Sequence, residues 1–500
     1  MTAYEHLTER FARHAALSEA AGMLHWDSST LMPRGGSDAR TEQLTALNLT
    51  CHELITASEV GDHLAQADAE QKSGSRPLSD WETANLREMR RLWLHATALP
   101  EDLVAAQSRA NSHCEMLWRE ARPAADYAMV LPALKEVLSL SRQEASVKAE
   151  ALGCSPYDAL LDLYEPGGSA AEIDVIFDDI AAFLPDFLEQ VLTHQGKQPT
   201  PQVPSGPFPI EKQEALGRQL MGAVGFDFDF GRLDVSLHPF CGGVPDDVRI
   251  TTRYDVDDFA KSLMGVLHET GHALYERGLP QEWRRQPVGT ARGMAMHESQ
   301  SLLIEMQACR SAAFVAFLAP LAKEAFGGQG PTWEADNLIR LYNQVKPDFI
   351  RVDADEVTYP AHIILRYRLE KALIAGEMEL EDLPAAWNEQ MRGLLGLVPP
   401  HDGVGCLQDI HWYDGAWGYF PTYSLGAMTA AQLFHAAVAE VPEIPDAIGR
   451  GDFSPLMAWL REKVHGLGSL LSTPETIKQA TGQTLDPEIF KNHLRQRYLP

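Results

Sequence analysis

Residues 257–280 read DDFAKSLMGVLHETGHALYERGLP, a pattern that predicts a single buried helix. Apolar residues recur at intervals of three and four, which is the period of an amphipathic helix. Asp257 or Asp258 can cap its first turn, and Gly278, followed by Pro280, ends it. The segment therefore has its own start and stop signals as well as a stripe that faces a core.

Inside this helix, residues 268–272 follow the pattern H-E-x-x-H. His268 and His272 are four residues apart, so both imidazoles project from one face and can reach one metal ion. Glu269 lies beside them and can take a proton from a water molecule, which is the core of a zinc hydrolase. His52 and Glu53 repeat only the first half of the pattern and are predicted to lie on a helix surface.

A catalytic zinc site needs a third protein ligand and an open position for water. Residues 293–305 predict a second helix about twenty residues after the first, which lets it return antiparallel. We favour Glu298 as the third ligand. Glu305 and His297 are the alternatives that the spacing leaves open.

The rest of the chain is predominantly helical in its periodicity. Loops are predicted at 66–79 and 195–209, and the main β candidate is 226–253, where F-D-F-D-F alternates and β-branched residues cluster. We expect a small sheet beside the metal helix, with an edge strand that binds substrate by backbone pairing. The helical segments are predicted at 4–22, 37–60, 80–120, 128–151 and 171–195.

Composition restricts the partners. Asp and Glu number 70 against 42 Lys and Arg, and the net charge of −28 argues against a nucleic-acid or anionic-membrane surface. The six cysteines show no paired spacing, so we expect free thiols rather than disulfides or a thiolate metal site. The N-terminal residues lack a secretory signal pattern, and no apolar run is long enough to span a bilayer, so we expect a cytoplasmic protein.

Several separated blocks carry a family resemblance. Besides the metal helix and the segment 24–33, they are His238-Pro239-Phe240, residues 247–251 (DVRIT), 297–301 (HESQS), 350–355 (IRVDAD) and 405–412 (GCLQDIHW). With these blocks in order over nearly the whole chain, the protein resembles the thermostable (Taq-type) carboxypeptidases, a family of zinc metallocarboxypeptidases.

The resemblance implies a mainly α-helical protein, in which residues 1–500 form one large body with a deep active-site cleft and a small sheet near the metal helix. Two helical subdomains that flank the cleft are the alternative to an undivided domain. The resemblance also implies one zinc ion per chain, replaceable by cobalt or manganese, a homodimer, broad side-chain specificity and poor action on proline.

The expected reaction removes the C-terminal residue of a peptide. Glu269 would accept a proton from the attacking water and return it to the leaving amine. The oxyanion needs a donor opposite the metal, and Tyr423 and His411 are the candidates, with Tyr419 as the alternative. Ordinary aromatic packing is the competing interpretation for each of these three residues.

A carboxypeptidase must also bind the free C-terminal carboxylate, for which a guanidinium is suited. Arg351 and Arg249 are the candidates, and a buried ion-pair network is the structural alternative for both. His238 and the pair 408–409 are expected to line the cleft or to support the histidine ligands.

Two rival functions remain open from the sequence. The first is an oligopeptidase that cleaves internal bonds of short peptides. The second is a zinc-bearing scaffold that binds peptides without cutting them, which the presence of Glu269 disfavours. The sequence does not select the preferred C-terminal residue, the physiological substrate or the metal used in the cell.

Overall fold

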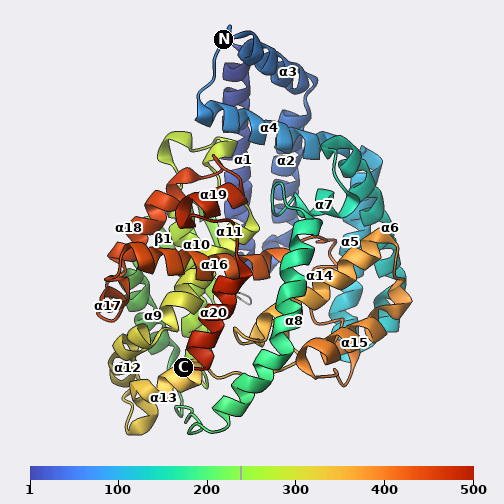
Figure 1. Cartoon of the computed structure of the whole chain (residues 1–500). Helices are drawn as coiled ribbons and strands as arrows, with labels where there is room; N and C mark the ends of the chain where they lie inside the picture. The colour runs from blue at the N-terminus through green and yellow to red at the C-terminus, as the bar shows by residue number, and fades with distance from the viewer. Residues whose placement is uncertain (237–238) are drawn as a thin grey trace.

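A computed structural model describes residues 1–236 and 239–500 and confirms a mainly α-helical fold with one small sheet (Figure 1). The first half of the chain contains α1 (Ala3–Thr30), α2 (Ser37–Thr56), α3 (Ser58–Ser73), α4 (Asp80–Ala98), α5 (Glu101–Ala124), α6 (Tyr127–Leu152), α7 (Pro156–Leu161), α8 (Ala170–Gln195) and α9 (Ile210–Val224). The second half contains α10 (Phe259–Gly278), α11 (Met294–Leu302), α12 (Ala312–Phe326), α13 (Ala335–Tyr342), α14 (Tyr359–Ala375), α15 (Leu383–Leu395), α16 (Pro421–Glu440), α17 (Ile444–Ile448), α18 (Ser454–Lys463), α19 (Thr473–Thr481) and α20 (Pro487–Tyr498).

The predicted helices are present, and two of them are divided. The segment 37–60 breaks at Ala57 and the segment 80–120 breaks at Leu99–Pro100, where the backbone is extended. The predicted loop at 66–79 is wrong in its first half, because α3 continues to Ser73. The few apolar residues of α3 are spaced so that they bury one narrow face of the helix. The high average polarity of the segment hides this pattern in the sequence. His52 and Glu53 are exposed on α2, as predicted.

The predicted sheet lies next to α10 and has three strands in the order β1-β3-β2. Strand β1 (Gly231–Val235) runs parallel to β3 (Asp247–Thr252), and β2 (Cys241–Val244) pairs with β3 antiparallel. The alternating stretch 226–230 was expected to be a strand and is a turn instead. Asp227 accepts a hydrogen bond from the Asp229 amide there, and the Phe226 and Phe228 rings pack edge to face.

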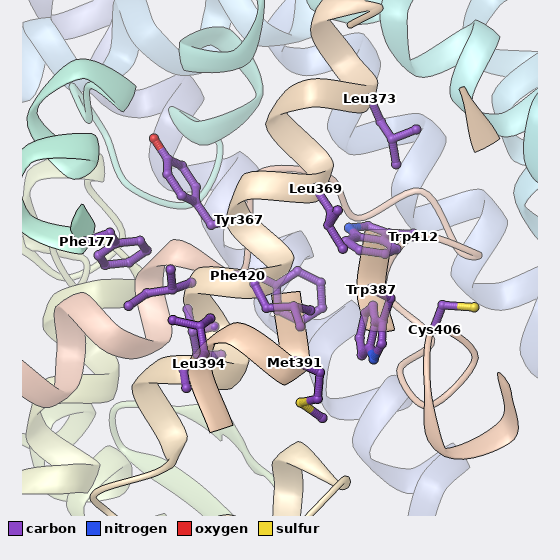
Figure 2. Close-up of a cluster of buried hydrophobic side chains, with 14 of the residues drawn as sticks. Phe177, Tyr367, Leu369, Leu373, Trp387, Met391, Leu394, Cys406, Trp412 and Phe420 are labelled. Carbon is purple, nitrogen blue, oxygen red and sulfur yellow. The ribbon is translucent and has the colours of Figure 1, made fainter. Parts of the chain in front are cut away.

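Two large hydrophobic cores lie on either side of α16. One joins α5–α8 with α14 and α15, and Figure 2 shows part of it, where side chains of α14 and α15 meet Trp412 and Phe420. The other joins α9–α13 with α17–α19. Helix α16 contributes Met428 to the first and Leu433 to the second, so it connects the two. The division into two helical subdomains and the deep active-site cleft stay predictions.

At the centre of the molecule, α11 packs against both α10 and α16 (Figure 1). A Cβ atom at Gly271 of α10 would lie 2.5 Å from the Gln300 carbonyl oxygen of α11. A Cβ atom at Gly426 of α16 would lie 2.8 Å from the Cβ atom of Glu298 on α11. Both helix contacts therefore depend on a residue without a side chain.

Within the described residues, no single helix combines the length and apolar composition needed to cross a bilayer, although the bent pair Pro287–Cys309 and Ala312–Phe326 meets that test jointly. The six cysteines are all unpaired, as the sequence predicts.

The close approach at Gly271 generates a testable prediction. Gly271→Ala should lower the free energy of unfolding by about 1–3 kcal/mol, because the added methyl group would meet the backbone of α11. Gly265→Ala on the same helix is the matched control, since a Cβ atom there meets nothing within 4 Å. The control should be neutral or stabilise by roughly 0.5–1 kcal/mol through helix propensity. Denaturant unfolding measures both, and equal stabilities would contradict the packing argument.

Candidate metal centre

Helix α10 is held on two sides, and this fixes the direction of its histidines. The Asp258 carboxylate caps the helix by accepting hydrogen bonds from the amides of Ala260 and Lys261. Its apolar residues pack into the second core on one side, while Val266 and Ala273 pack against the sheet on the other. His268 and His272 lie on the remaining face and keep 21% and 12% side-chain exposure.

The structure brings His268, His272 and Glu298 together from α10 and α11. One donor atom from each residue lies within 4.8 Å of the other two. The Glu298 Oε2 atom is 3.7 Å from the His268 Nε2 atom and 3.4 Å from the His272 Nε2 atom. Two imidazoles and one carboxylate are the donor set of a catalytic zinc site with an open fourth position, so these residues fit a divalent metal.

The two alternatives for the third ligand occupy a different place. Glu305 Oε2 lies 3.0 Å from the His268 Nδ1 atom, and His297 Nδ1 lies 2.7 Å from the His272 Nδ1 atom. Both therefore contact the imidazole nitrogens that face away from the three donor atoms. Outer partners of this kind fix the orientation and tautomer of a ligating histidine. This geometry favours Glu298 over Glu305 and His297 as the third ligand.

Each outer partner is held in turn. Arg310 donates to Glu305 over 2.7 Å, and His297 Nε2 lies 2.8 Å from Glu276. If His272 binds the metal through Nε2, its Nδ1–H donates to His297, whose Nε2–H then donates to Glu276. Glu305 lies in η4 (Leu303–Cys309), a π-helical turn that continues α11. Such turns are rare and occur often at functional sites.

Burial and charge shift the titration of the cluster. Burial raises the pKa of Glu298, but His268 and His272 outweigh it and lower the pKa to about 2. Burial lowers the pKa of His272 to about 4, whereas at His268 the carboxylates of Glu298 and Glu305 outweigh burial and raise the pKa to about 10. A metal ion bound here would have to displace the proton of His268. Burial and the Glu298 carboxylate raise the pKa of Glu269 to about 7. A carboxylate with this pKa can both accept and return a proton near neutral pH.

The predicted oxyanion residues form one aromatic group beside the cluster. His411 Nε2 lies 3.3 Å from the Tyr423 hydroxyl, and the Tyr419 and Tyr423 rings are 5.2 Å apart. Burial raises the pKa of Tyr423 to about 12, and the charge on Glu298 adds to the rise. Tyr423 lies about one turn before Gly426 on α16, and Gly426 packs against Glu298, so this group lies near the three donor atoms. Both hydroxyls are protonated and can donate.

Arg351 is 7% exposed and lies against the Tyr423 ring, with its Cζ atom 4.8 Å from the ring centroid. Its guanidinium donates twice to Asp409 Oδ1, over 3.0 and 2.7 Å. Arg366, which is fully buried, donates to the other oxygen of Asp409 over 2.6 Å. The buried ion-pair network considered from the sequence therefore exists around Arg351.

This network carries an excess positive charge. Asp409 supplies one negative charge against two guanidiniums, and the pKa of Arg366, lowered by burial, is still about 10. Burial lowers the pKa of His362 to about 3 and that of His411 to about 4, so neither imidazole changes the balance at neutral pH. One positive charge next to Tyr423 is left for an anion.

Arg249 occupies a different environment. On β3 it makes a bidentate ion pair with Asp247, with contacts of 3.0 and 2.8 Å, and lies over the Trp26 ring of α1. Its charge is therefore neutralised by a carboxylate that is itself 42% exposed. The third predicted substrate residue, His238, lies outside the residues that the structure describes, and its role stays a prediction.

Residues 408 and 409 do not contact the histidines of the cluster. Gln408 accepts a hydrogen bond from the Arg351 amide and donates to the Phe349 carbonyl, so it shapes the chain that carries Arg351. Asp409 pairs with Arg351 and Arg366. Their expected part as cleft-wall support is consistent with these contacts, whereas the residues that contact His268 and His272 are Glu305 and His297.

Sequence reasoning missed Tyr359 and Arg366. The charges on Glu298 and Arg351 both influence the pKa of Tyr359, and its ring centroid is 6.3 Å from that of Tyr423. Tyr359 and Arg366 are seven residues apart on α14, a spacing that places both on one helix face. This spacing was a usable signal, but the sequence did not show that the face meets Arg351.

Known proteins match the chain over its full length. A family model described as carboxypeptidase Taq (M32) metallopeptidase matches residues 6–498. Thermostable carboxypeptidase 1 of Thermus thermophilus is 39% identical over 504 residues, which cover 99% of this chain and 98% of that protein. Carboxypeptidase 1 of Bacillus subtilis is 35% identical over 485 residues, which cover 96% and 95%. The solved structure of Trypanosoma cruzi metallocarboxypeptidase 1 has a TM-score of 0.97 at 44% identity and covers 100% and 99%.

The agreement extends well beyond the H-E-x-x-H helix. The family model spans residues 6–498, and the Trypanosoma cruzi structure matches this chain over its whole length. The resemblance inferred from separated sequence blocks is thus confirmed. The chain belongs to the carboxypeptidase Taq (M32) family of metallopeptidases and is a metal-dependent carboxypeptidase.

Proposed function

We propose that this chain removes C-terminal residues from peptides at a zinc ion held by His268, His272 and Glu298. The observation that carries the proposal is the convergence of these three donor atoms within 4.8 Å. The Nδ1 atoms of the two histidines point elsewhere and already contact Glu305 and His297. Two nitrogen donors and one oxygen donor suit zinc, and cobalt or manganese could substitute. When bound, the ion supplies Lewis acidity, which polarises the scissile carbonyl and makes water a stronger acid.

Glu269 is proposed as the general base and acid. It follows His268 directly, is 7% exposed, and has a pKa of about 7 because burial and Glu298 disfavour its charged form. In this role it takes the proton of the attacking water and returns it to the leaving amine. Tyr423 and His411 donate to the oxyanion, and Tyr419, whose ring packs against that of Tyr423, is the alternative donor.

Arg351 is proposed to bind the C-terminal carboxylate of the substrate. The excess positive charge of Arg351, Asp409 and Arg366 supports this role, because a second carboxylate would neutralise the cluster. Arg249 is less suited, since its guanidinium already pairs with both carboxylate oxygens of Asp247.

Three further properties stay proposals. A cytoplasmic location is supported by six unpaired cysteines, and the absence of nucleic-acid or membrane partners by the net charge of −28. The proposal of a homodimer rests on the family resemblance alone. Light scattering coupled to gel filtration would measure the molecular mass in solution.

The metal centre gives a first prediction for this function. His268→Ala should lose bound metal and turnover of a blocked dipeptide together. Glu269→Gln should retain the metal and lose about two to four powers of ten in turnover, because the proton acceptor is removed while the donor set is not. Metal content by mass spectrometry and turnover, with and without added zinc, measure both.

His52→Ala is the control for this prediction, because His52 is exposed on α2. Nearly unchanged turnover in Glu269→Gln would contradict the proposed base. Full metal affinity in Glu298→Ala, together with metal loss in Glu305→Ala, would show that the third ligand is Glu305.

A second prediction concerns the oxyanion donor. Tyr423→Phe removes the hydroxyl next to His411 without changing the ring, so kcat should fall by on the order of a hundredfold with little change in KM. Tyr419→Phe, measured in parallel, should have a smaller effect. The reverse order of the two variants would assign the donor to Tyr419.

A third prediction separates the carboxypeptidase from an oligopeptidase. Arg351→Ala should reduce the preference for a free-acid dipeptide over its C-terminal amide by roughly one to two powers of ten, mainly through KM. Arg351→Lys should recover part of the loss, because an ammonium group cannot make two parallel bonds. Efficient cleavage of the amide by the unmodified enzyme would instead indicate an oligopeptidase.

Arg249→Ala provides the comparison for Arg351, and its acid-over-amide preference should be unchanged. The loss of that preference in Arg249→Ala, with Arg351→Ala unfolded, would move the carboxylate anchor to Arg249. Circular dichroism on each variant distinguishes unfolding from lost recognition.

A further inference from the structure

The end of the π-helical turn η4 is held by the last helix of the chain. The final carbonyls of any helix lack an intrahelical donor and need a partner from elsewhere. In η4, the carbonyls of Met306 and Gln307 receive hydrogen bonds from the two terminal nitrogens of Arg497 on α20, the second over 3.2 Å. Residues 190 and more positions apart in the chain are thereby joined next to Glu305.

A single buried carboxylate organises this contact. Glu356 is 4% exposed and accepts hydrogen bonds from Arg497, Tyr498 and Gln307, each over 3.0 Å. His493 lies 2.9 Å from the same carboxylate. Burial raises the pKa of Glu356, but Arg497 and His493 outweigh it and hold the pKa well below its ordinary value. Glu356 is therefore a buried carboxylate whose charge is balanced by these partners. Loss of one partner would leave its buried charge incompletely paired.

The position of Glu356 links two parts of the active site. It directly follows the block 350–355 that carries Arg351, and through Gln307 and Arg497 it holds η4. Within η4, Glu305 reaches back to the His268 Nδ1 atom over 3.0 Å. The Arg310 guanidinium pairs with Glu305 and also donates to the Tyr342 carbonyl, which secures the far end of the turn.

We propose that α20 is a positioning element of the metal centre, in which Arg497 and Glu356 fix the η4 turn and the turn holds Glu305 against the imidazole of His268. The inference rests on the proposed function, because it takes His268 to be a metal ligand. Arg497 touches neither substrate nor ligand atoms and acts through Glu305. A shift of η4 would lengthen the contact between Glu305 and His268, and the imidazole would lose its fixed orientation and tautomer.

The test measures metal binding rather than turnover alone. Arg497→Met keeps the length of the side chain and removes the guanidinium. It should raise the metal dissociation constant, determined by competition with a chelator, by on the order of tenfold, the lower end of what loss of an outer partner costs. The visible absorption of the cobalt-loaded protein should change as well, because it reports ligand geometry. Arg497→Lys keeps the charge, so its metal dissociation constant should lie between those of the unmodified protein and Arg497→Met.

Arg495→Ala is the matched control on the same helix. Arg495 is 43% exposed, contacts Glu488 and Asn492, and lies over the Phe183 ring, so it helps α20 to dock without touching η4. Its replacement should leave the metal dissociation constant and the cobalt spectrum unchanged, even if the unfolding temperature falls. A loss of metal affinity equal to that of Arg497→Met would show that general loosening of α20 is the cause and would overturn the proposal.

A double-mutant cycle with Glu305→Gln locates the path of the effect. If Arg497 acts through Glu305, adding Arg497→Met to Glu305→Gln should change the dissociation constant by less than about twofold. The same tenfold rise in both backgrounds, or an unchanged constant in a folded Arg497→Met protein, would overturn the proposal. If Arg497→Met does not fold, Glu356→Gln takes its place in the cycle with the same criteria. Unchanged metal affinity in His268→Ala would instead overturn the proposed function.

Discussion

The close packing of α11 against α10 and against α16 is the constraint on which the rest of the site depends. Histidine and glutamate side chains are short, so their donor atoms can converge only if the helices that carry them approach closely. Gly271 removes a side chain where α10 meets the backbone of α11, and Gly426 does so where α16 meets Glu298. In this arrangement, Glu298 lies 3.4 Å from His272 and 3.7 Å from His268.

Around this contact, the protein buries several carboxylates that pair with arginine side chains. Glu305 pairs with Arg310, Asp409 with Arg351 and Arg366, and Glu356 with Arg497. Buried ion pairs add little net stability, because desolvation offsets the attraction. Their geometric requirements are strict, however, so each pair fixes a backbone segment that carries a residue of the site. In this protein, the buried ion pairs mainly fix the positions of the segments that carry the site residues.

Sequence periodicity predicted most helices correctly because amphipathic spacing is a local property of the chain. It failed where average polarity concealed a narrow buried face, as in α3, and where alternation arose from a turn, as at Phe226 to Phe230. Both errors have one cause. A segment of five to eight residues does not specify whether its apolar side chains meet a sheet neighbour, a helix or each other.

The sequence by itself determined the helix with His268, Glu269 and His272 and the carboxypeptidase family, because spacing along one helix fixes which side chains share a face. It left the cap open between Asp257 and Asp258, and the structure has Asp258 in that position. Only the tertiary structure decided that Glu298 faces the histidines while Glu305 and His297 stand behind them. It alone also joined Arg351 to Asp409 and Arg366, and Arg497 to the η4 turn. These contacts link residues tens to nearly two hundred positions apart, and such pairings follow from helix packing, which local spacing does not encode.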